Sequence, residues 1–470
     1  MTYELRDMQR IAVERCVDFF LNGKPGRNAI AVAPTSFGKS LLISNVVAQL
    51  DAPALVFQPS KEILEQNLSK FHAYGYRPSV FSASMKRKVI GDVTLATIGS
   101  VAGNKKRASK SHLFQDFPYV IVDECDLVGA KKGQYRDFFL ELGDVKVLGV
   151  TATPWRMHSD SFGTMAKFLT RTRPRIFQDV IHYTQVSEMV EQGYWAKLEY
   201  HKMFSGFDRH SVKVNSTGAD YDERALYLFQ QKIGFQDRVA DVVQRLRKAG
   251  RRNCLVFVRF VKEAEYIASK VPGLVVVTGE TSIEERAAIG REFRAGRIWG
   301  IINCGVYLVG FDYPELETIV LARLTRSLRV AYQTMGRGVR IHPDKESCWI
   351  VDMVGLTDEF GRIENLKLYC EGQSQWAIWG KPDGEESECQ LTNVYLAGGN
   401  ENRCKRCGQP ILFWARHVVT GRASPMQKPM NGTNPSIAIR SINSKTCFEI
   451  VGAGHPEATH INHWAVCSKR

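Results

Sequence analysis

The run "APTSFGKS", at positions 33–40, has residue types and spacing suited to binding phosphate. It follows the strand-like run "NAIAVAP" and precedes the helix-like run "LLISNVVAQL", which is the order found around phosphate-binding loops. In such a loop, backbone N–H groups and a helix start surround phosphate oxygens, a lysine neutralises their charge, and a hydroxyl binds magnesium. Gly38, Lys39 and Ser40 supply these groups. Ala33 replaces the first glycine of the common pattern, and its small side chain suffices where positive φ is not needed.

Polar residues follow two later strand-like runs. In "VIVDECD", Asp123 and Glu124 come directly after the apolar residues. There an aspartate can hold magnesium, and a glutamate can orient or deprotonate an attacking water. A solvated acidic turn is the alternative, but the position downstream of a phosphate loop favours nucleotide chemistry. In "GVTATPWR", at 149–156, we expect the hydroxyls of Thr151 and Thr153 to link this site to a second domain.

A basic segment, "QTMGRGVR" at 333–340, completes the set. Its pattern predicts a helix, on which Gln333, Arg337 and Arg340 share one face at spacings of four and then three residues. Two arginines aimed across a cleft can stabilise the charge of a transferring phosphoryl group. Gly336 and Gly338 would each cost a helix interior about 1 kcal/mol relative to alanine. They therefore predict close approach to a neighbouring group.

The elements that must position these residues are two series of apolar, strand-length runs separated by helical patterns. The first series is "NAIAVAP", "PALVFQP", "DVTLAT", "YVIVDE" and "KVLGVTAT"; the second is "NCLVFVR", "GLVVVTG", "GIINCG", "TIVLAR" and "CWIVDM". Such runs predict an α/β fold with two buried parallel sheets. We expect domains over 1–156 and 226–355, a connecting or accessory segment over 157–225, a linker or extension over 356–400, and a separate module over 401–470.

Composition limits the partners and the compartment. The formal charge is +14, from 63 Lys and Arg against 49 Asp and Glu. This excess fits a polyanion such as nucleic acid, or an inert basic surface, and composition alone leaves both open. No apolar run is long enough to span a bilayer, and "MTYELRDMQR" lacks the apolar core of a signal peptide. We therefore expect no membrane partner and a reducing cytoplasm, where the 11 cysteines form no disulfide framework.

The last segment has the spacing of a metal site. Cys404 and Cys407 form a C-x-x-C pair, and His463 and Cys467 add H-x-x-x-C near the end, a tetrahedral set suited to structural zinc. Reduced cysteines in a small domain are the alternative. The rival ligands are Cys447, His455, His460 and His417. Residues 401–470 contain ten Lys and Arg against three Glu, a net +7. A basic module held by zinc is typical of nucleic-acid docking domains.

The order "LRDMQ", "APTSFGKS", "DECD", "TATP", "GVYLVGFD", "QTMGRGVR", over roughly residues 3–345, resembles the superfamily 2 helicases. It is similar to their DEAD/DEAH-like group, which includes RadD-type and UvsW-type DNA repair helicases of bacteria and phages. In this group Ala33 is the expected residue of the phosphate loop. The resemblance implies two RecA-like domains in tandem and a small C-terminal zinc-binding domain. It also implies the cytoplasm of a bacterial or phage-infected cell.

The resemblance implies roles for individual residues. Lys39 would bind the β- and γ-phosphates, Ser40 and Asp123 would hold Mg²⁺, Glu124 would be the catalytic base, and Arg337 and Arg340 would be arginine fingers. Gln9 matches the glutamine that reads adenine, so the nucleotide would be ATP. Asp126 stands where close relatives often carry histidine. The residues expected to contact ATP or couple it to the strand are Gln9, Thr35, Gly38, Lys39, Ser40, Gly310, Asp312 and Gln333.

A nucleic-acid track requires hydroxyls and basic groups that contact phosphates without reading bases. Candidates follow strand-like runs of both domains: Ser60, Lys61, Thr97, Ser100, Arg259 and Thr278. For each, a helix cap or loop hydroxyl is the alternative. The clusters "MKRK" and "NKKRASK" would extend this track, or are solvated surface.

These features predict an ATP-dependent DNA helicase or translocase that acts on forked or branched DNA in repair, recombination or replication. One alternative is an RNA helicase. Another is the motor subunit of a restriction or defence complex, with a protein partner that supplies a nuclease. A third is a binding module with a decayed ATPase core, against which the intact set of Lys39, Glu124 and Arg337 argues.

Overall fold

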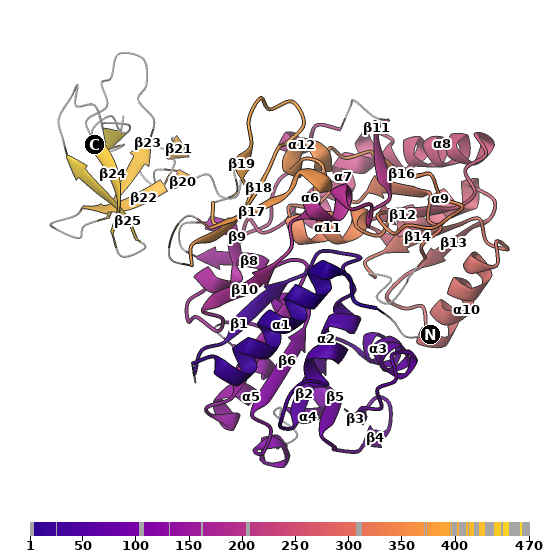
Figure 1. Cartoon of the computed structure of the whole chain (residues 1–470). Helices are drawn as coiled ribbons and strands as arrows, with labels where there is room; N and C mark the ends of the chain where they lie inside the picture. The colour runs from indigo at the N-terminus through magenta and orange to yellow at the C-terminus, as the bar shows by residue number, and fades with distance from the viewer. Residues whose placement is uncertain are drawn as a thin grey trace. The chain divides into compact units, whose positions relative to one another are not determined.

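The computed structural model describes residues 4–394 apart from 25, 103–107, 131, 161–162, 204–206, 307–312, 371 and 373, and beyond them residue 396 and seven short strands. The chain divides into two compact units (Figure 1). Unit 1 consists of Met1–Arg156, Ala166–Arg209 and Tyr227–Val394. Unit 2 consists of Met157–Met165, His210–Leu226 and Tyr395–Arg470. Both parallel sheets belong to unit 1.

The first sheet has eight strands in the order β10-β1-β7-β6-β2-β5-β3-β4, all parallel except for the β3–β4 pair. Its strands are β1 Ala29–Val32, β2 Ala54–Gln58, β3 Ser79–Ser82, β4 Arg87–Lys88, β5 Val93–Thr97, β6 Tyr119–Asp123, β7 Lys146–Thr151 and β10 Asp179–Tyr183. Its helices are α1 Asp7–Asn22, α2 Lys39–Val47, α3 Lys61–Ala73, α4 Ile98–Val101 and α5 Gln134–Leu142. Every residue of β1 and β2 is buried, because helices cover both faces of a parallel sheet.

The second sheet is entirely parallel, in the order β11-β16-β15-β12-β14-β13. Its strands are β11 Lys197–Lys202, β12 Cys254–Val258, β13 Leu274–Val277, β14 Gly300–Cys304, β15 Thr318–Ala322 and β16 Ser347–Asp352. Its helices are α8 Phe235–Lys248, α9 Val261–Lys270, α10 Ile283–Arg294 and α11 Leu328–Met335. The expected α/β fold with two parallel sheets is therefore confirmed.

The range 157–225, predicted as a connecting segment, contributes a strand to each sheet. β10 pairs in parallel with β1, and β11 pairs in parallel with β16. The other elements here are the paired strands β8 Trp155–Asp160 and β9 Gly163–Phe168, the helices α6 Val186–Glu191 and α7 Glu223–Lys232, and 3-10 turns at Leu169–Arg171 and Arg209–Ser211. The strands β10 and β1 lie about 150 positions apart in the sequence, so local periodicity cannot reveal their pairing.

The range 356–400, predicted as a linker or extension, contains folded elements. α12 spans Leu356–Phe360, a 3-10 turn spans Ile363–Asn365, and an antiparallel sheet is formed by β17 Lys367–Cys370, β18 Trp376–Gly380 and β19 Cys389–Gln390. The charged run "KPDGEESE" connects β18 to β19. Its polar composition therefore marks a hairpin connection.

Unit 2 is described by its strands. β24, β25, β22, β23 and β26 form one sheet in that order, and β20 pairs with β21. Their bounds are β20 Asn402–Arg403, β21 Pro410–Ile411, β22 Phe413–His417, β23 Ala423–Gln427, β24 Ile437–Ile442, β25 Lys445–Ile450 and β26 Ile461–Asn462. The four predicted zinc ligands, Cys404, Cys407, His463 and Cys467, lie outside the described residues.

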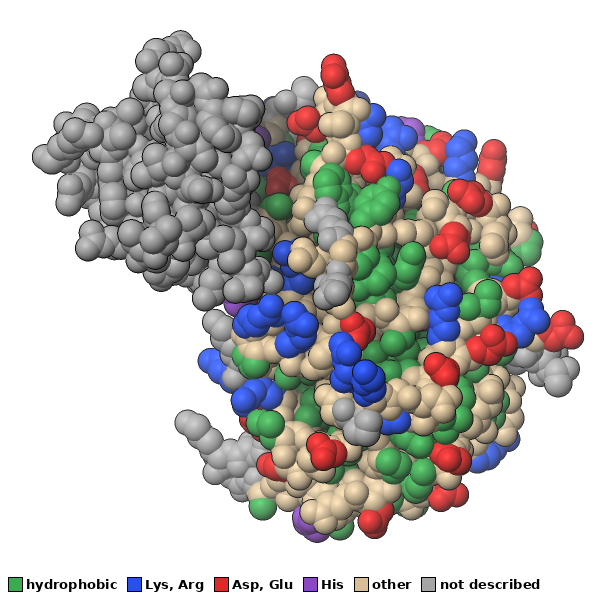
Figure 2. Space-filling view, turned by 60° about the vertical axis from the view of Figure 1, so that its left-hand side comes forward, with side chains coloured by type: hydrophobic (Ala, Val, Ile, Leu, Met, Phe, Trp, Pro, Cys, Tyr) green, Lys and Arg blue, Asp and Glu red, His purple; other side chains and the backbone are tan. Residues whose placement is uncertain are grey.

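On the face shown in Figure 2, Lys and Arg side chains lie among acidic and hydrophobic ones and form no continuous basic stripe. None of the helices in the described ranges has the length and apolarity needed to cross a membrane.

Candidate nucleotide-binding site

The predicted chemical groups converge on one cavity of about 520 Å³ in unit 1. The phosphate loop, the acidic pair and "TATP" follow β1, β6 and β7, which are neighbours in the order β1-β7-β6. Ligands of open α/β sheets bind beyond the carboxyl ends of such strands. The opposite wall comes from α11 and the turn after it. The predicted residues that line the cavity are Thr35, Lys39, Ser40, Ser60, Asp123, Glu124, Gln333, Arg337 and Arg340.

The phosphate loop requires glycine at one position and strains another. Gly38 has φ +96°, and a Cβ there would lie 2.6 Å from Nε2 of Gln9, so both conformation and space exclude a side chain. Ser36 has φ 65°. This left-handed conformation costs an L-residue about 1–2 kcal/mol. The loop therefore keeps a glycine-like shape at Ser36, and the bulky Phe37 is fully buried behind it.

Gln9 supports the loop from beneath. Its Nε2 donates to the carbonyl oxygen of Phe37 at 2.5 Å, and its Oε1 accepts from the backbone N–H of Arg6 at 3.0 Å. The Arg6 guanidinium carbon lies 3.8 Å from the centre of the Tyr194 ring. Gln9 is not among the cavity-lining residues of the described chain. Its position beside the loop suits either recognition of a base or support of the loop backbone.

An ion pair joins the phosphate loop to the acidic pair. Lys39 Nζ contacts Glu124 Oε1, and both side chains are largely buried. Burial opposes the positive charge, but Glu124 and Asp123 outweigh it and raise the pKa of Lys39. Glu124 has φ 52°, a left-handed conformation that turns the chain sharply after β6. Lys39 thus stays protonated and able to neutralise an anion.

A buried hydrogen-bond network connects the two predicted magnesium ligands. Ser40 Oγ donates to Asn67 Oδ1 at 2.6 Å, and Asn67 Nδ2 donates to Asp123 Oδ2 at 3.2 Å and to Gln58 Oε1 at 2.6 Å. Burial and the nearby Glu124 raise the pKa of Asp123 to about 6, against the opposing effect of Lys39. Hydroxyl, carboxylate and amide oxygens form the hard donor set that Mg²⁺ prefers. These residues therefore fit a magnesium ion.

The basic segment differs from its predicted conformation. α11 ends at Met335, so 336–340 form a turn, and the prediction that Gln333, Arg337 and Arg340 share one helical face is wrong. Two glycines close together disfavour continuation of the helix. A Cβ on Gly336 would lie 2.8 Å from the Tyr332 carbonyl oxygen, and one on Gly338 would lie 2.7 Å from a cysteine sulfur, so both positions lie against close neighbours. The predicted close approach is confirmed.

The phosphate loop is held from the second sheet and from the connecting segment. Tyr332 of α11, fully buried, accepts from the backbone N–H of Thr35 at 3.2 Å. Trp195 Nε1 donates to the carbonyl oxygen of Thr35 at 2.8 Å. The backbone N–H and C=O of Thr35 are therefore both hydrogen-bonded to residues more than 150 positions away in the sequence. No local sequence pattern can indicate such contacts.

Asp126 forms a second link between the sheets. Its buried carboxylate pairs with Arg329 of α11 and accepts from Thr151 Oγ1 at 3.1 Å. The Thr151 hydroxyl accepts in turn from the backbone N–H of Thr153 at 3.0 Å. Burial and Glu124 raise the pKa of Asp126 to about 6, while Arg329 lowers it. A chain of contacts thus runs from β7 through Asp126 to α11.

We expect Arg329→Met to destabilise unit 1 by roughly 3–5 kcal/mol, because it leaves a buried carboxylate without its cation. Asp126→Asn should also destabilise it. The double variant should recover at least about 1 kcal/mol of the summed loss, as directly paired residues do in double-mutant cycles. Denaturant unfolding of the four proteins measures this coupling. Strictly additive effects would show that the pair contributes nothing.

Three polar groups of the cavity were not predicted from the sequence. Asn67 and Lys70 of α3 line it, and Arg329 of α11 lies beside Gln333. Burial, Arg340 and Lys39 lower the pKa of Lys70. The helical spacing of Ile63, Asn67 and Lys70 on a helix that starts after a strand was a usable signal. Arg329 had none, because its partner Asp126 is distant in sequence.

The track candidates of the first sheet lie at adjacent strand ends, since Gln58 of β2 pairs with Thr97 of β5. Thr97 and Ser100 share a hydrogen bond of 2.8 Å, and Lys61 pairs with a glutamate of its own helix at 3.6 Å. Ser60 caps α3 by accepting from a backbone N–H at 3.3 Å, and it also lines the nucleotide cavity. Ser60 therefore caps a helix, which was the alternative to a nucleic-acid contact at this position.

In the second sheet, Arg259 follows β12 and Thr278 follows β13, with β14 between these strands. Thr278 Oγ1 accepts from the N–H of Glu280 at 3.2 Å, a local turn contact. Gly310 and Asp312 lie outside the described residues.

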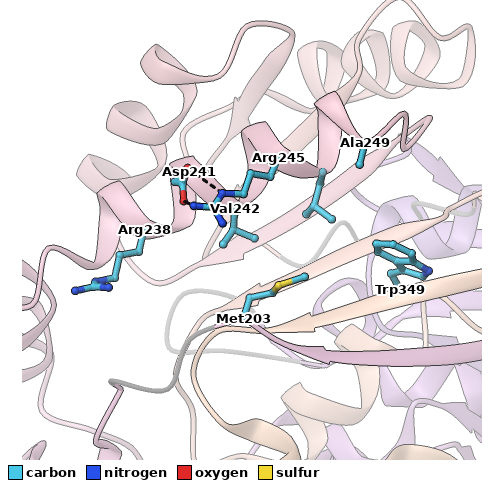
Figure 3. A pocket seen from close by; sticks show the side chains of 8 residues that line it. Met203, Arg238, Asp241, Val242, Arg245, Ala249 and Trp349 are labelled. Atoms are coloured by element: carbon cyan, nitrogen blue, oxygen red, sulfur yellow. Dashed lines mark hydrogen bonds and ion pairs between the residues drawn. The ribbon is translucent and has the colours of Figure 1, made fainter.

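A separate cavity of about 300 Å³ is lined by residues of α8, by Trp349 of β16 and by Met203 (Figure 3). Met203 and Trp349 form its apolar floor, and Arg238, Asp241 and Arg245 of α8 lie along its edge. None of the predicted site residues lines it.

Comparison with known proteins identifies the class. Residues 2–156 match the family described as type III restriction enzyme, res subunit, and residues 237–342 match the helicase conserved C-terminal domain. With this fold and cavity, the chain belongs to the superfamily 2 helicases, a class of ATP-dependent enzymes. The predicted resemblance is confirmed at that level.

Several relatives are similar at low identity. A 51.5 kDa protein of a Lactococcus phage is 24% identical over 82% of this chain and 78% of its own length. The ATP-dependent DNA helicase uvsW of Enterobacteria phage T4 is 23% identical over 74% of this chain and 70% of its own. The putative ATP-dependent helicase IRC3 of Saccharomyces cerevisiae is 22% identical over 75% of this chain, which spans only 52% of that relative's length.

A solved structure shares the fold. The ATP-dependent Type ISP restriction-modification enzyme LlaBIII bound to DNA matches with a TM-score of 0.51 and 13% identity, over 75% of this chain and 28% of that one.

Proposed function

We propose that this protein is an ATP-dependent DNA translocase or helicase that acts on forked or branched DNA in repair, recombination or replication. One observation carries the proposal. A single cavity collects Lys39 and the acidic pair from the first sheet, and Arg337 and Arg340 from the second. A relative from phage T4 and a translocase of Sulfurisphaera tokodaii are named for DNA, which favours DNA as the polyanion.

In this proposal seven of the cavity residues have a task in ATP hydrolysis. Lys39 neutralises the β- and γ-phosphates, and Ser40, Asp123 and Asn67 hold Mg²⁺. A bound magnesium ion offsets charge on the phosphate oxygens. Glu124 removes the proton of the attacking water. Arg337 and Arg340 stabilise the charge that spreads over the transferring phosphoryl group.

The Lys39–Glu124 ion pair suggests how ATP activates its own base. A γ-phosphate carries more negative charge than one carboxylate and competes for Lys39. When Lys39 moves to the phosphate, Glu124 loses its partner and its carboxylate becomes available to water. Hydrolysis chemistry and phosphate binding are coupled in this way through one side chain.

Contacts between the sheets would transmit the chemistry to DNA. Tyr332 and Arg329 of α11 hold the phosphate loop and Asp126, so a change at the phosphates alters how the sheets contact each other. The track candidates follow strands of both sheets. A relative movement of the sheets would therefore advance the gripped strand. In unit 2, a zinc ion on Cys404, Cys407, His463 and Cys467 would hold a basic docking module, which metal analysis of the purified protein tests.

We expect DNA, and not RNA of the same sequence, to stimulate ATP hydrolysis, and tailed forks or four-way junctions to be unwound or migrated faster than blunt duplex. Lys39→Ala should abolish stimulated hydrolysis and unwinding, because no other group in the loop neutralises the phosphates. Lys24→Ala, a substitution beyond the end of α1, is the matched control. Equal stimulation by RNA would favour the RNA-helicase alternative, whose named counterpart is a mouse RNA helicase 22% identical. Stimulation by DNA without unwinding would favour the motor of a restriction complex.

A further inference from the structure

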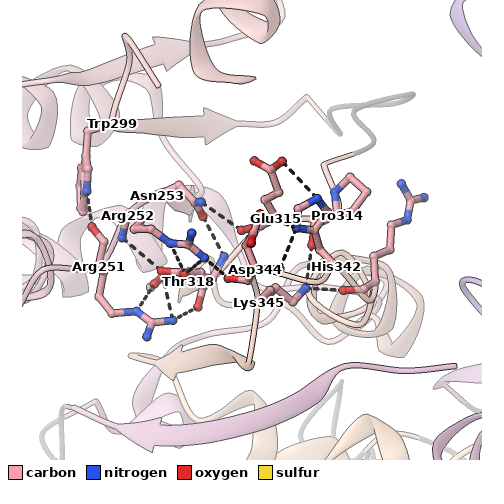
Figure 4. Close-up of polar contacts among 12 residues, drawn as sticks. Arg251, Arg252, Asn253, Trp299, Pro314, Glu315, Thr318, His342, Asp344 and Lys345 are labelled. Carbon is pink, nitrogen blue, oxygen red and sulfur yellow. Dashed lines mark hydrogen bonds and ion pairs between the residues drawn. The ribbon is translucent and has the colours of Figure 1, made fainter. Parts of the chain in front are cut away.

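The turn that carries the two arginines is held by one buried lysine. Lys345, 7% exposed, donates from its Nζ to the carbonyl oxygens of Pro314 at 3.0 Å, Gly338 at 2.8 Å and Arg340 at 2.5 Å (Figure 4). A lysine ammonium has three N–H donors, and here each has a carbonyl acceptor. Lys345 therefore contacts the turn at Gly338, which lies between the two arginines, and at Arg340 itself.

The turn needs such support. Because α11 ends at Met335, the carbonyl groups after it lack the partners that a continuing helix would provide. The backbone N–H groups of Gly336, Arg337 and Gly338 donate back into the last turn of the helix. The carbonyls of Gly338 and Arg340 instead point to Lys345. Hydrogen bonds from a charged donor are roughly twice as strong as neutral ones, so this contact dominates the position of the turn.

Other charges near Lys345 are already engaged. Glu317, the nearby carboxylate that favours its charge, forms ion pairs with Arg251 and Arg252. Arg340 opposes the charge, and the Cys348 thiol favours it. The three backbone carbonyls are thus the hydrogen-bond partners that the structure gives the ammonium.

We propose that Lys345 is a positioning residue for ATP hydrolysis: its ammonium fixes the backbone of 338–340 against Pro314 and thereby holds Arg337 and Arg340 at the cavity. This inference rests on the proposed function, in which these arginines act on the phosphoryl group. Lys345 itself does not line the cavity.

The electrostatics of Lys345 supply a test. Burial lowers its pKa to about 8 from the ordinary 10.5, with Arg340 acting in the same direction. Above this pH the amine has two donors for three carbonyls. The pKa of Lys345 is lower in the folded than in the unfolded chain, so between about pH 8 and 10.5 the unfolded chain binds more protons. The contribution of Lys345 to the free energy of unfolding therefore increases as the pH rises from about 8 to 10.5. A loss of turnover there cannot be attributed to unfolding through Lys345.

The first experiment compares Lys345→Met with Lys146→Met. Lys146 also donates to a backbone carbonyl, that of Phe20, at the start of β7. We expect Lys345→Met to lower the kcat of DNA-stimulated hydrolysis by about 10- to 100-fold with the KM for ATP nearly unchanged. The reason is that displaced arginines stabilise the transition state less well. Lys146→Met should keep the wild-type kcat. A wild-type kcat in Lys345→Met overturns the inference and leaves the proposed function intact.

The second experiment needs no disruptive variant. The wild-type kcat should fall as pH rises through about 8, whereas Lys345→Arg, whose guanidinium stays charged, should keep its kcat over the same range. An identical profile in both proteins, or no fall in the wild type, overturns the inference even if Lys345→Met does not fold. Absence of DNA-stimulated hydrolysis in the wild type would instead refute the proposed function, and the inference with it.

Discussion

Arg337→Ala and Arg340→Ala should each reduce DNA-stimulated ATP hydrolysis by about 10³-fold or more, the effect of removing an arginine finger. Both side chains enter the cavity from the turn after α11, opposite Lys39 and Glu124. A guanidinium offers several donors in a fixed plane to the oxygens of a transferring phosphoryl group, which a shorter side chain cannot replace. Steady-state hydrolysis at saturating DNA, with separate kcat and KM for ATP, measures the loss.

Two comparisons make this prediction specific. Lysine at either position should recover little, because an ammonium cannot reproduce the planar, bidentate contact. Arg297→Ala removes an exposed arginine that pairs with Glu292 and should leave turnover unchanged. If Arg337→Ala and Arg340→Ala both hydrolysed ATP at the wild-type rate, the cavity would not be the site of phosphoryl transfer.

Glu124→Gln should lower kcat by about 10²- to 10⁴-fold, the range expected when a general base is removed. The amide keeps the shape of the side chain but cannot accept a proton from water. The substitution also removes the ion pair with Lys39, so that no carboxylate at position 124 competes with the ATP phosphates for Lys39. ATP binding should therefore be retained or tightened while turnover is lost. Equilibrium binding of a fluorescent ATP analogue, together with single-turnover hydrolysis, separates the two effects.

A control substitution keeps this test selective. Glu141→Gln changes an exposed carboxylate of α5 that accepts from the Ser109 hydroxyl, and it should alter neither property. Loss of ATP binding in Glu124→Gln would indicate that the carboxylate supports the phosphate loop instead of acting on water. The Lys39–Glu124 ion pair would then be a structural contact.

The proposed zinc ion and DNA-docking module belong to residues 401–470, and the four proposed zinc ligands lie outside the described residues. The five-stranded sheet of unit 2 shows that this region has its own fold. The net charge of residues 401–470 is +7, half of the total of +14. The basic character inferred from composition is therefore concentrated in residues 401–470, whereas the part of unit 1 seen in Figure 2 shows mixed charge.

Features with local causes could be predicted from the sequence. The phosphate loop was recognised because its glycine, lysine and hydroxyl act within eight consecutive residues, and Gly38 proves to need both its φ and its lack of a side chain. The acidic pair was recognised because it ends a buried strand. The two parallel sheets follow from apolar runs, since strands buried on both faces need apolar residues at every position.

The tertiary structure alone decided how these segments meet. The Thr35 backbone contacts Tyr332 and Trp195, Asp126 pairs with Arg329, and the turn at 336–340 depends on Lys345. Each contact joins residues whose distance in space is unrelated to their distance in sequence, apart from the last. There the end of α11 was missed, because the helical spacing of Gln333, Arg337 and Arg340 was given more weight than the low helix propensity of Gly336 and Gly338. By itself, the sequence determined which groups could bind and split a nucleotide. Packing of the two sheets determined that they face one cavity, because only folding brings the ends of distant strands together.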